Sequence, residues 1–174
     1  MRFDLLCHPE TPASEVTGVT VEVLVGQDDV LLTYCVHDYG KVTVPPWQSP
    51  ARVNGLWRTT CFEMFLMPAG EDGYVEFNFS PSCEWAAYAF TGYRDGMCSL
   101  GRDVAPHIER LADGVEVDCH LGGLPGGALH LALSAVIEEA DGTKSYWALA
   151  HPPGPPDFHH PACFAATLPS PAAP

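Results

Sequence analysis

Two glutamates and an asparagine interrupt the apolar alternation of two neighbouring segments. Glu63 lies in the middle of residues 60–67, and Glu76 and Asn78 lie within residues 74–80. Glu and Asn are poor formers of β-strands, and a strand face that is merely solvated more often carries Thr, Lys or Ser. The pattern therefore favours a surface that recognises a ligand. The alternative is an ordinary solvated face with two acids.

Two tryptophans accompany these polar residues. Trp57 precedes the first segment and Trp85 follows the second. Aromatic rings contact the C–H surface of a sugar, and carboxylate or amide groups pair with its hydroxyls. We therefore predict a small-molecule ligand, with a carbohydrate or another neutral polar compound as the leading class. The predicted ligand-binding residues are Trp57, Glu63, Glu76, Asn78 and Trp85.

Strand alternation decides which of these side chains share a face. A tight turn over residues 80–84 is expected to place Asn78 beside Ala87 and Glu76 beside Ala89. The two alanines would floor a depression, with aromatic rings as its walls. The opposite faces of the same strands are expected in the core; they carry Phe62, Met64 and Leu66, and Val75, Phe77 and Phe79.

Paired acids also occur in enzymes. Glu63 and Glu76 would serve a glycoside hydrolase as general acid and base, but catalytic residues more often lie on loops or strand ends than in mid-strand. The sequence contains no P-loop, GxGxxG or GxSxG motif. We therefore predict a small non-catalytic binding module with no catalytic residues. A hydrolase and a structural or protein-interaction domain are the alternatives, and the oligomeric state stays open.

A second group of chemically capable residues lies near the C-terminus. Asp157, His159 and Cys163 are ligand types that suit zinc, which makes His159 and Cys163 weak metal candidates. The proline-rich residues 152–156 instead favour a stiff loop that closes over one end of the fold, with Asp157 or His159 bonded to loop backbone. We predict the structural role and no cofactor, while zinc and haem remain open.

Composition restricts the partners. The 174 residues carry a net charge of −14, which repels phosphate backbones and anionic lipid, so we expect no nucleic-acid or membrane partner. The first nine residues lack the apolar core of a signal peptide. The seven cysteines include no CxxC pair, and several occupy alternating strand positions as small hydrophobes. These features favour a reduced, cytoplasmic protein.

Short alternating segments between turn residues define the expected fold. The 17 prolines and 16 glycines lie mostly between about ten such segments. This spacing predicts an all-β, two-sheet antiparallel β-sandwich of jelly-roll or immunoglobulin-like shape. We expect one domain over residues 1–168 and a disordered tail over 169–174. The predicted strands are 16–25, 30–38, 42–44, 60–67, 74–80, 84–93, 106–111, 115–121, 128–138, 145–150 and 162–168, and a helical turn competes only at 132–140.

Three motifs in order carry a family resemblance. Trp57-x5-Glu63, residues 76–93 and residues 157–161 resemble the DOMON-like proteins related to family 9 carbohydrate-binding modules, above all their bacterial single-domain branch. In the sugar-binding relatives a tryptophan walls the sugar and an acid on the next strand binds hydroxyls, and Trp57 and Glu63 match these positions. Cys61 stands where those relatives tend to carry Asp. Other relatives bind haem through Met and His, and no positions here match those ligands.

Overall fold

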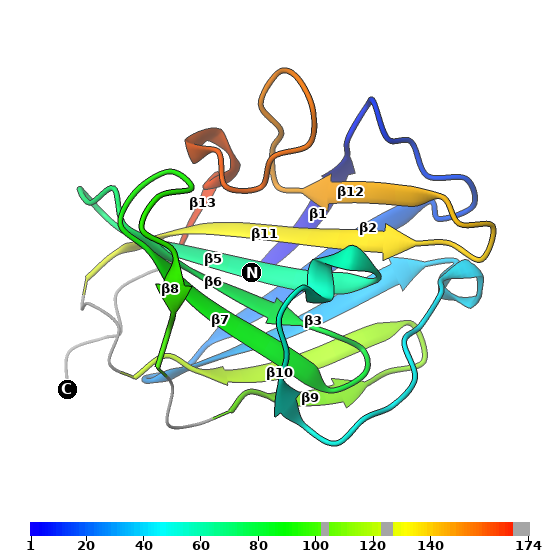
Figure 1. Cartoon of the computed structure of the whole chain (residues 1–174), viewed down its shortest axis with the longest axis horizontal. Coiled ribbons are helices and arrows are strands. Elements are labelled where there is room, and N and C mark those ends of the chain that lie inside the picture. Colours follow the sequence, from blue (N-terminus) through cyan, green and yellow to red (C-terminus); the bar gives the residue numbers. More distant parts are fainter. Residues whose placement is uncertain (102–104, 123–126, 169–174) are drawn as a thin grey trace.

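The computed structural model describes residues 1–101, 105–122 and 127–168, which form strands joined by turns and three short 3-10 helices (Figure 1). The strands are β1 (Arg2–Cys7), β2 (Gly18–Val25), β3 (Asp29–His37), β4 (Ala51–Arg52), β5 (Cys61–Pro68), β6 (Tyr74–Phe79), β7 (Glu84–Phe90), β8 (Cys98–Ser99), β9 (His107–Arg110), β10 (Gly114–His120), β11 (Leu129–Glu138), β12 (Lys144–Ala148) and β13 (Ala166–Leu168). The 3-10 helices are η1 (Tyr39–Lys41), η2 (Leu56–Arg58) and η3 (Pro161–Cys163). The all-β class predicted from the sequence is confirmed. None of the helices in the described ranges is long and apolar enough to cross a membrane.

The strands follow one continuous path rather than two separate sheets. Their order is β4-β7-β6-β5-β11-β12-β1-β2-β3-β10-β9, with β13 on β11 and β8 on β7. Strand β1 joins the two halves, because its residues 2–5 pair with β2 while Leu6 and Cys7 pair with β12. The named pairs are antiparallel except β4 with β7, which is parallel. The expected two-sheet arrangement is therefore not confirmed, because the strands form one continuous curled sheet.

The core lies between the two halves of this curled sheet. One half contributes alternate residues of β2, β3 and β10, and the other contributes those of β5, β6 and β11. The core residues predicted on β5 and β6 are buried as expected, except that Val75 is only partly buried. Tyr34 from β3 spans the core, and its hydroxyl donates to the backbone oxygen of Glu63 at 2.7 Å. This contact fixes the core side of the strand that carries the first predicted acid.

Several segments differ from the sequence-based expectation. Strand β1 was not predicted, because its Asp4 breaks a short apolar run. Residues 132–140 are strand up to Glu138, with no helix. The segment 162–168 is strand only from Ala166, because η3 with a proline at its start occupies residues 161–163. The tail predicted at 169–174 lies outside the described residues.

The β6–β7 turn shifts the predicted register by one residue. Phe79 pairs with Trp85 and Asn78 with Ala86, whereas the sequence analysis paired Asn78 with Ala87. Cys83 adopts a left-handed φ of 75°, and its amide donates to the Ser80 carbonyl at 3.0 Å. The turn is therefore one residue shorter than the predicted pairing requires, which moves every side chain of β7 to the other face relative to the prediction. Glu76 therefore lies opposite Tyr88, not Ala89.

Candidate functional site

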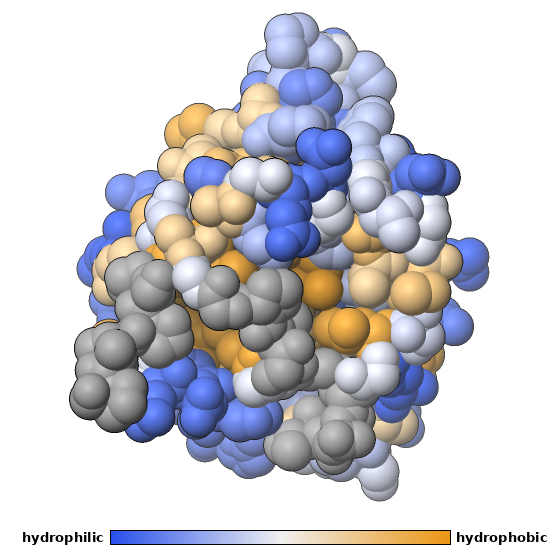
Figure 2. All heavy atoms as spheres, turned by 90° about the vertical axis from the view of Figure 1, so that its left-hand side faces the viewer, coloured by the Kyte–Doolittle hydropathy of each residue, from blue (hydrophilic) through white to orange (hydrophobic). Residues whose placement is uncertain are grey.

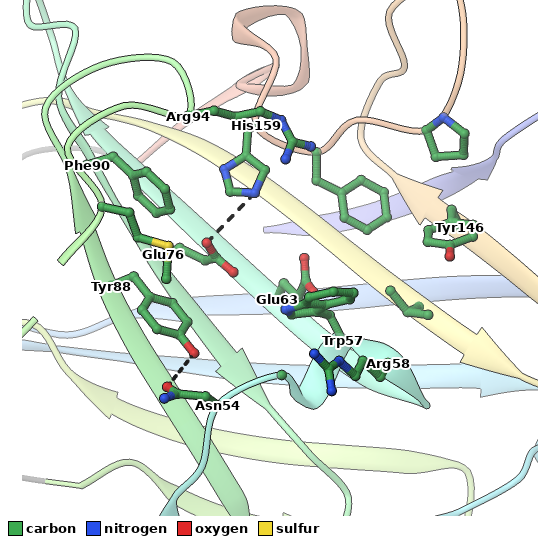
Figure 3. Close-up of a pocket in the computed structure, with 15 residues that line it drawn as sticks. Asn54, Trp57, Arg58, Glu63, Glu76, Tyr88, Phe90, Arg94, Tyr146 and His159 are labelled. Atoms are coloured by element: carbon green, nitrogen blue, oxygen red, sulfur yellow. Dashed lines mark hydrogen bonds and ion pairs between the residues drawn. The ribbon is translucent and has the colours of Figure 1, made fainter. Parts of the chain in front are cut away.

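A cavity of about 710 Å³ opens on the face of the β7-β6-β5-β11 strands that points away from the core (Figure 3). The residues that line it come from the η2 segment, the central strands, the loop after β7 and the segment after β12. They are Asn54, Gly55, Trp57, Arg58, Glu63, Glu76, Tyr88, Phe90, Arg94, Met97, Val136, Tyr146, Pro156, Phe158 and His159. Segments more than 100 residues apart in the sequence thus share one concave site.

Glu63 and Glu76 form the polar floor of this cavity. Their residues are only 3% and 5% exposed, and they lie diagonally on adjacent strands, because Glu63 pairs with Asn78 in the β5–β6 ladder. The Ser134 hydroxyl donates to Glu63 Oε2 at 3.1 Å. The Asn78 amide donates to Glu76 Oε1 at 2.7 Å. Each acid therefore has a fixed orientation before any ligand arrives.

Burial favours the protonated form of both carboxyl groups. It raises the pKa of Glu63 well above its usual value, and the nearby charge of Glu76 raises that pKa further. Burial also raises the pKa of Glu76, to about 7, against the opposing effects of the Asn78 hydrogen bond and of the Arg94 charge. The floor therefore does not carry two full negative charges at neutral pH.

Aromatic side chains form the walls. Trp57 is 49% exposed and is presented by η2, which follows Gly55 in a left-handed conformation with φ of 79°. The Tyr88 hydroxyl donates to Asn54 Oδ1 at 2.8 Å (Figure 3), which ties β7 to the η2 segment. Phe90, Tyr146 and Phe158 complete the aromatic lining. Exposed rings around a polar floor are the combination that a sugar-sized ligand needs.

The loop after β12 is fastened over one end of the cavity by a single carboxylate. Asp157 Oδ1 accepts from Arg94 Nη2 at 2.7 Å and Nε at 3.2 Å, and Oδ2 accepts from the Tyr93 hydroxyl. The His159 amide also donates to Asp157 Oδ1, at 3.1 Å. The predicted hydrogen bond between Asp157 and the loop backbone is therefore confirmed. It positions Phe158 and His159 against the central strands.

His159 faces Glu76 as a neutral imidazole. Burial, together with the Arg94 charge, lowers its pKa to about 4. The Tyr74 oxygen accepts from the Arg94 amide at 3.3 Å and shares a hydrogen bond of 2.8 Å with His159 Nδ1. Nε2 is 3.9 Å from Glu76 Oε2. At neutral pH this contact is too long for a hydrogen bond and lacks the charge of an ion pair.

The two weak metal candidates have other partners. His159 contacts Tyr74, and Cys163 Sγ donates to the Asp157 carbonyl at 3.2 Å. Burial raises the pKa of the Cys163 thiol to about 11. Within residues 1–101, 105–122 and 127–168, no three His, Cys, Asp or Glu side chains are grouped to hold a metal ion. All seven cysteines are free thiols.

The structure brings together most of the predicted ligand-binding residues. Trp57, Glu63 and Glu76 line the cavity, and Asn78 is buried beside Glu76. Trp85 does not lie at the cavity: the shifted register turns it into the core, with the Arg52 guanidinium 4.4 Å from its ring centroid. The remaining lining residues were not predicted from the sequence. The correct β7 register identifies Tyr88 and Phe90, because they lie on the face of β7 opposite to Trp85.

A second, smaller cavity offers less chemistry. Its volume is about 180 Å³ and its lining is mostly apolar, from the ends of β5, β6 and β7. Figure 2 shows hydrophobic surface at the left-hand end of the molecule as drawn in Figure 1, bordered by hydrophilic side chains. The lining includes Glu71, which is exposed. The larger cavity is therefore the candidate functional site.

Comparison with known proteins extends the description of the fold. No protein-family model matches the sequence, and no curated protein matches it. The chain is similar to the solved structure of a candidate carbohydrate-binding protein from Bacteroides uniformis ATCC 8492, with a TM-score of 0.68, 14% sequence identity, and coverage of 94% of this chain and 83% of that chain. It is also similar to a family 9 carbohydrate-binding module from Caldicellulosiruptor kristjanssonii, solved in complex with cellotriose and with glucose, at a TM-score of 0.49, 11% identity, and coverage of 83% of this chain and 70% or 72% of that chain. The TM-score of 0.68 shows that this chain and the Bacteroides protein share a fold.

Proposed function

We propose that this protein is a small non-catalytic module that binds a mono- or disaccharide in the larger cavity. The observation that carries the proposal is the pair of buried, pre-oriented carboxyl groups of Glu63 and Glu76 beneath aromatic walls. The volume of about 710 Å³ lies within the usual range for small-molecule sites, about 300 to 1,000 Å³. The fold shared with a candidate carbohydrate-binding protein of Bacteroides uniformis supports the same proposal.

The chemistry of the floor suits hydroxyl groups in particular. Protonated carboxyl groups donate as well as accept hydrogen bonds, and a sugar hydroxyl does the same. Trp57 offers an exposed ring for the C–H face of the sugar. We place the protein in the DOMON-like branch of this fold and in a reducing, cytoplasmic compartment. The seven free cysteines support that compartment.

Isothermal titration calorimetry with a panel of mono- and disaccharides tests the proposal. At least one sugar is expected to bind, and Trp57→Ala is expected to weaken that binding at least tenfold. Trp47→Ala is the matched control, because Trp47 is 58% exposed outside the cavity and also lies near an arginine, with Arg110 5.9 Å from its ring centroid. Its affinity is expected to equal that of the wild type.

A reducing-sugar assay on the same panel separates binding from hydrolysis. We expect binding without release of reducing ends. Release that disappears in both Glu63→Gln and Glu76→Gln would replace the binding module with a glycoside hydrolase. If no sugar binds and no reducing ends are released, the result would contradict the proposal and favour a protein-interaction domain.

A further inference from the structure

The hydrogen bonds of the cavity floor are not symmetric between its two acids. Asn78 Nδ2 donates to Glu76 Oε1, so Glu76 acts there as an acceptor. Asn78 Oδ1 is buried and has no hydrogen-bond partner among the described residues. Glu63 lies directly opposite Asn78 in the β5–β6 ladder. A protonated Glu63 would place a donor on the residue opposite this unpaired oxygen, whereas Glu76 already accepts from Asn78. We therefore take Glu76 as the acid that ionises.

The second oxygen of Glu76 lacks a hydrogen bond from the described part of the chain. His159 Nε2, on a neutral imidazole, lies 3.9 Å from Oε2. The nearby cation, Arg94, donates both of its guanidinium bonds to Asp157. A carboxylate this deeply buried is costly unless a donor or cation pairs with it. The cavity itself is the side from which that partner can come.

Three further features favour a cation over a neutral donor at this position. Aromatic rings line the cavity on several sides, and aromatic faces attract cations. The net charge of −14 attracts cationic ligands and repels anionic ones. Figure 3 shows Glu76 on the side of His159 and Phe90, whereas Arg58 lies with Trp57 on the other side. The Arg58 guanidinium, 5.5 Å from the Trp57 ring centroid, is thus separated from the Glu76 end.

We propose that the ligand is an amino sugar with a free, protonated amine, whose ammonium group pairs with Glu76 Oε2 while its ring lies toward Trp57. This inference rests on the proposed sugar-binding function and narrows it. Glu63 remains a neutral hydrogen-bonding acid in the complex, and Glu76 is the specificity-determining residue for the amine.

Matched pairs of sugars test this inference by calorimetry at about pH 7. The pairs are glucosamine with glucose, galactosamine with galactose, and mannosamine with mannose, and the N-acetylated forms serve as uncharged controls. In at least one pair the amine is expected to bind about tenfold tighter than the neutral sugar, because charge-assisted hydrogen bonds are roughly twice as strong as neutral ones. N-acetylation is expected to remove this preference.

Two glutamate variants locate the preference. Glu76→Gln keeps an oxygen for the Asn78 amide but loses the charge, so the amine and neutral forms are expected to bind equally. Glu63→Gln removes no charge under this assignment, and its preference for the amine is expected to match that of the wild type. Thermal unfolding of both variants confirms that they are folded, and the ratio measured in the wild type decides the question even if one variant is not.

The outcomes distinguish this inference from the function on which it rests. Equal binding of amine and neutral sugars would overturn the amino-sugar inference and leave the sugar-binding function in place. Tighter binding of glucuronic acid than of glucosamine would also overturn it, in favour of an anionic group at Arg58. If no sugar of any kind binds, both proposals are wrong.

Discussion

At the scale of single residues, the two floor acids oppose folding more than they support it. Glu63 and Glu76 are both buried, and neither forms an ion pair with a charged base at neutral pH within the described residues. Their raised pKa values mean that ionising these carboxyl groups costs more free energy in the folded protein than in water. Side chains that oppose folding are typical of sites kept for binding.

The pH dependence of stability follows from Glu76. Its pKa is about 7 in the folded protein against 4.5 for the ordinary side chain, so the folded state binds more protons between these values. The contribution of Glu76 to stability is therefore full below pH 4.5 and is lost as the pH rises through 7. Glu76→Gln is expected to match the wild type near pH 4.5 and to exceed it by up to about 3 kcal/mol at pH 8.

Urea unfolding of both proteins at several pH values measures this difference. Glu71→Gln, on an exposed turn residue, is the control and is expected to follow the wild type throughout. A difference between Glu76→Gln and wild type that stays constant with pH would contradict the raised pKa of Glu76.

Glu63→Gln distinguishes a ligand-binding acid from a scaffold acid. The glutamine oxygen can still accept from Ser134, and the amide adds a donor on the residue that pairs with Asn78, whose Oδ1 is buried without a partner among the described residues. The variant is expected to be as stable as the wild type or more stable by about 1 kcal/mol, and to bind sugar more weakly. Thermal unfolding at neutral pH measures the change. A clear fall in melting temperature would show that Glu63 belongs to the scaffold, and we would then reject it as a ligand-binding residue.

At the scale of elements, alternation predicts most of the site, but turn geometry does not follow from it. The period of two placed Glu63, Glu76 and Asn78 on one face, as the structure has them. It failed for Trp85 because the β6–β7 turn, which contains Cys83 in a left-handed conformation, is one residue shorter than expected. Cysteine is not a residue whose type signals that conformation. The unpredicted turn geometry therefore places Trp85 in the core, where the sequence predicted a wall residue of the site.

The Asp157 contacts hold one wall of the cavity in place. Asp157→Asn removes the charge that binds Arg94 and weakens the contacts to Tyr93 and the His159 amide. We expect a loss of about 1 to 2 kcal/mol in stability, since Arg94 is half exposed. Sugar affinity is expected to fall as well, because Phe158 and His159 lose their anchor.

Urea unfolding and calorimetry measure the two effects, with the exposed Asp72→Asn as control. Unchanged stability and affinity in Asp157→Asn would show that the loop does not depend on this carboxylate.

At the scale of the whole molecule, the sequence predicts the class of fold better than its connections. Alternating segments and turn residues indicated an all-β protein, and the core faces of β5 and β6 are as predicted apart from the half-buried Val75. Strand β1 pairs with both halves of the sheet, and such long-range pairing leaves no local pattern. The cavity depends on the same long-range packing, because segments around residues 57, 76, 94 and 158 meet only after the sheet curls.

The four tryptophans offer the most direct test of the claim that the larger cavity binds the ligand. Trp57 lies at the cavity, Trp47 is exposed elsewhere, and Trp85 and Trp147 are in the core. A ¹H–¹⁵N correlation spectrum resolves one indole signal for each, and single Trp→Phe variants assign them. Addition of the sugar that binds in calorimetry is expected to move the Trp57 indole signal furthest and to leave that of Trp47 unchanged. A spectrum in which the Trp47 signal moves while that of Trp57 stays fixed would contradict the account.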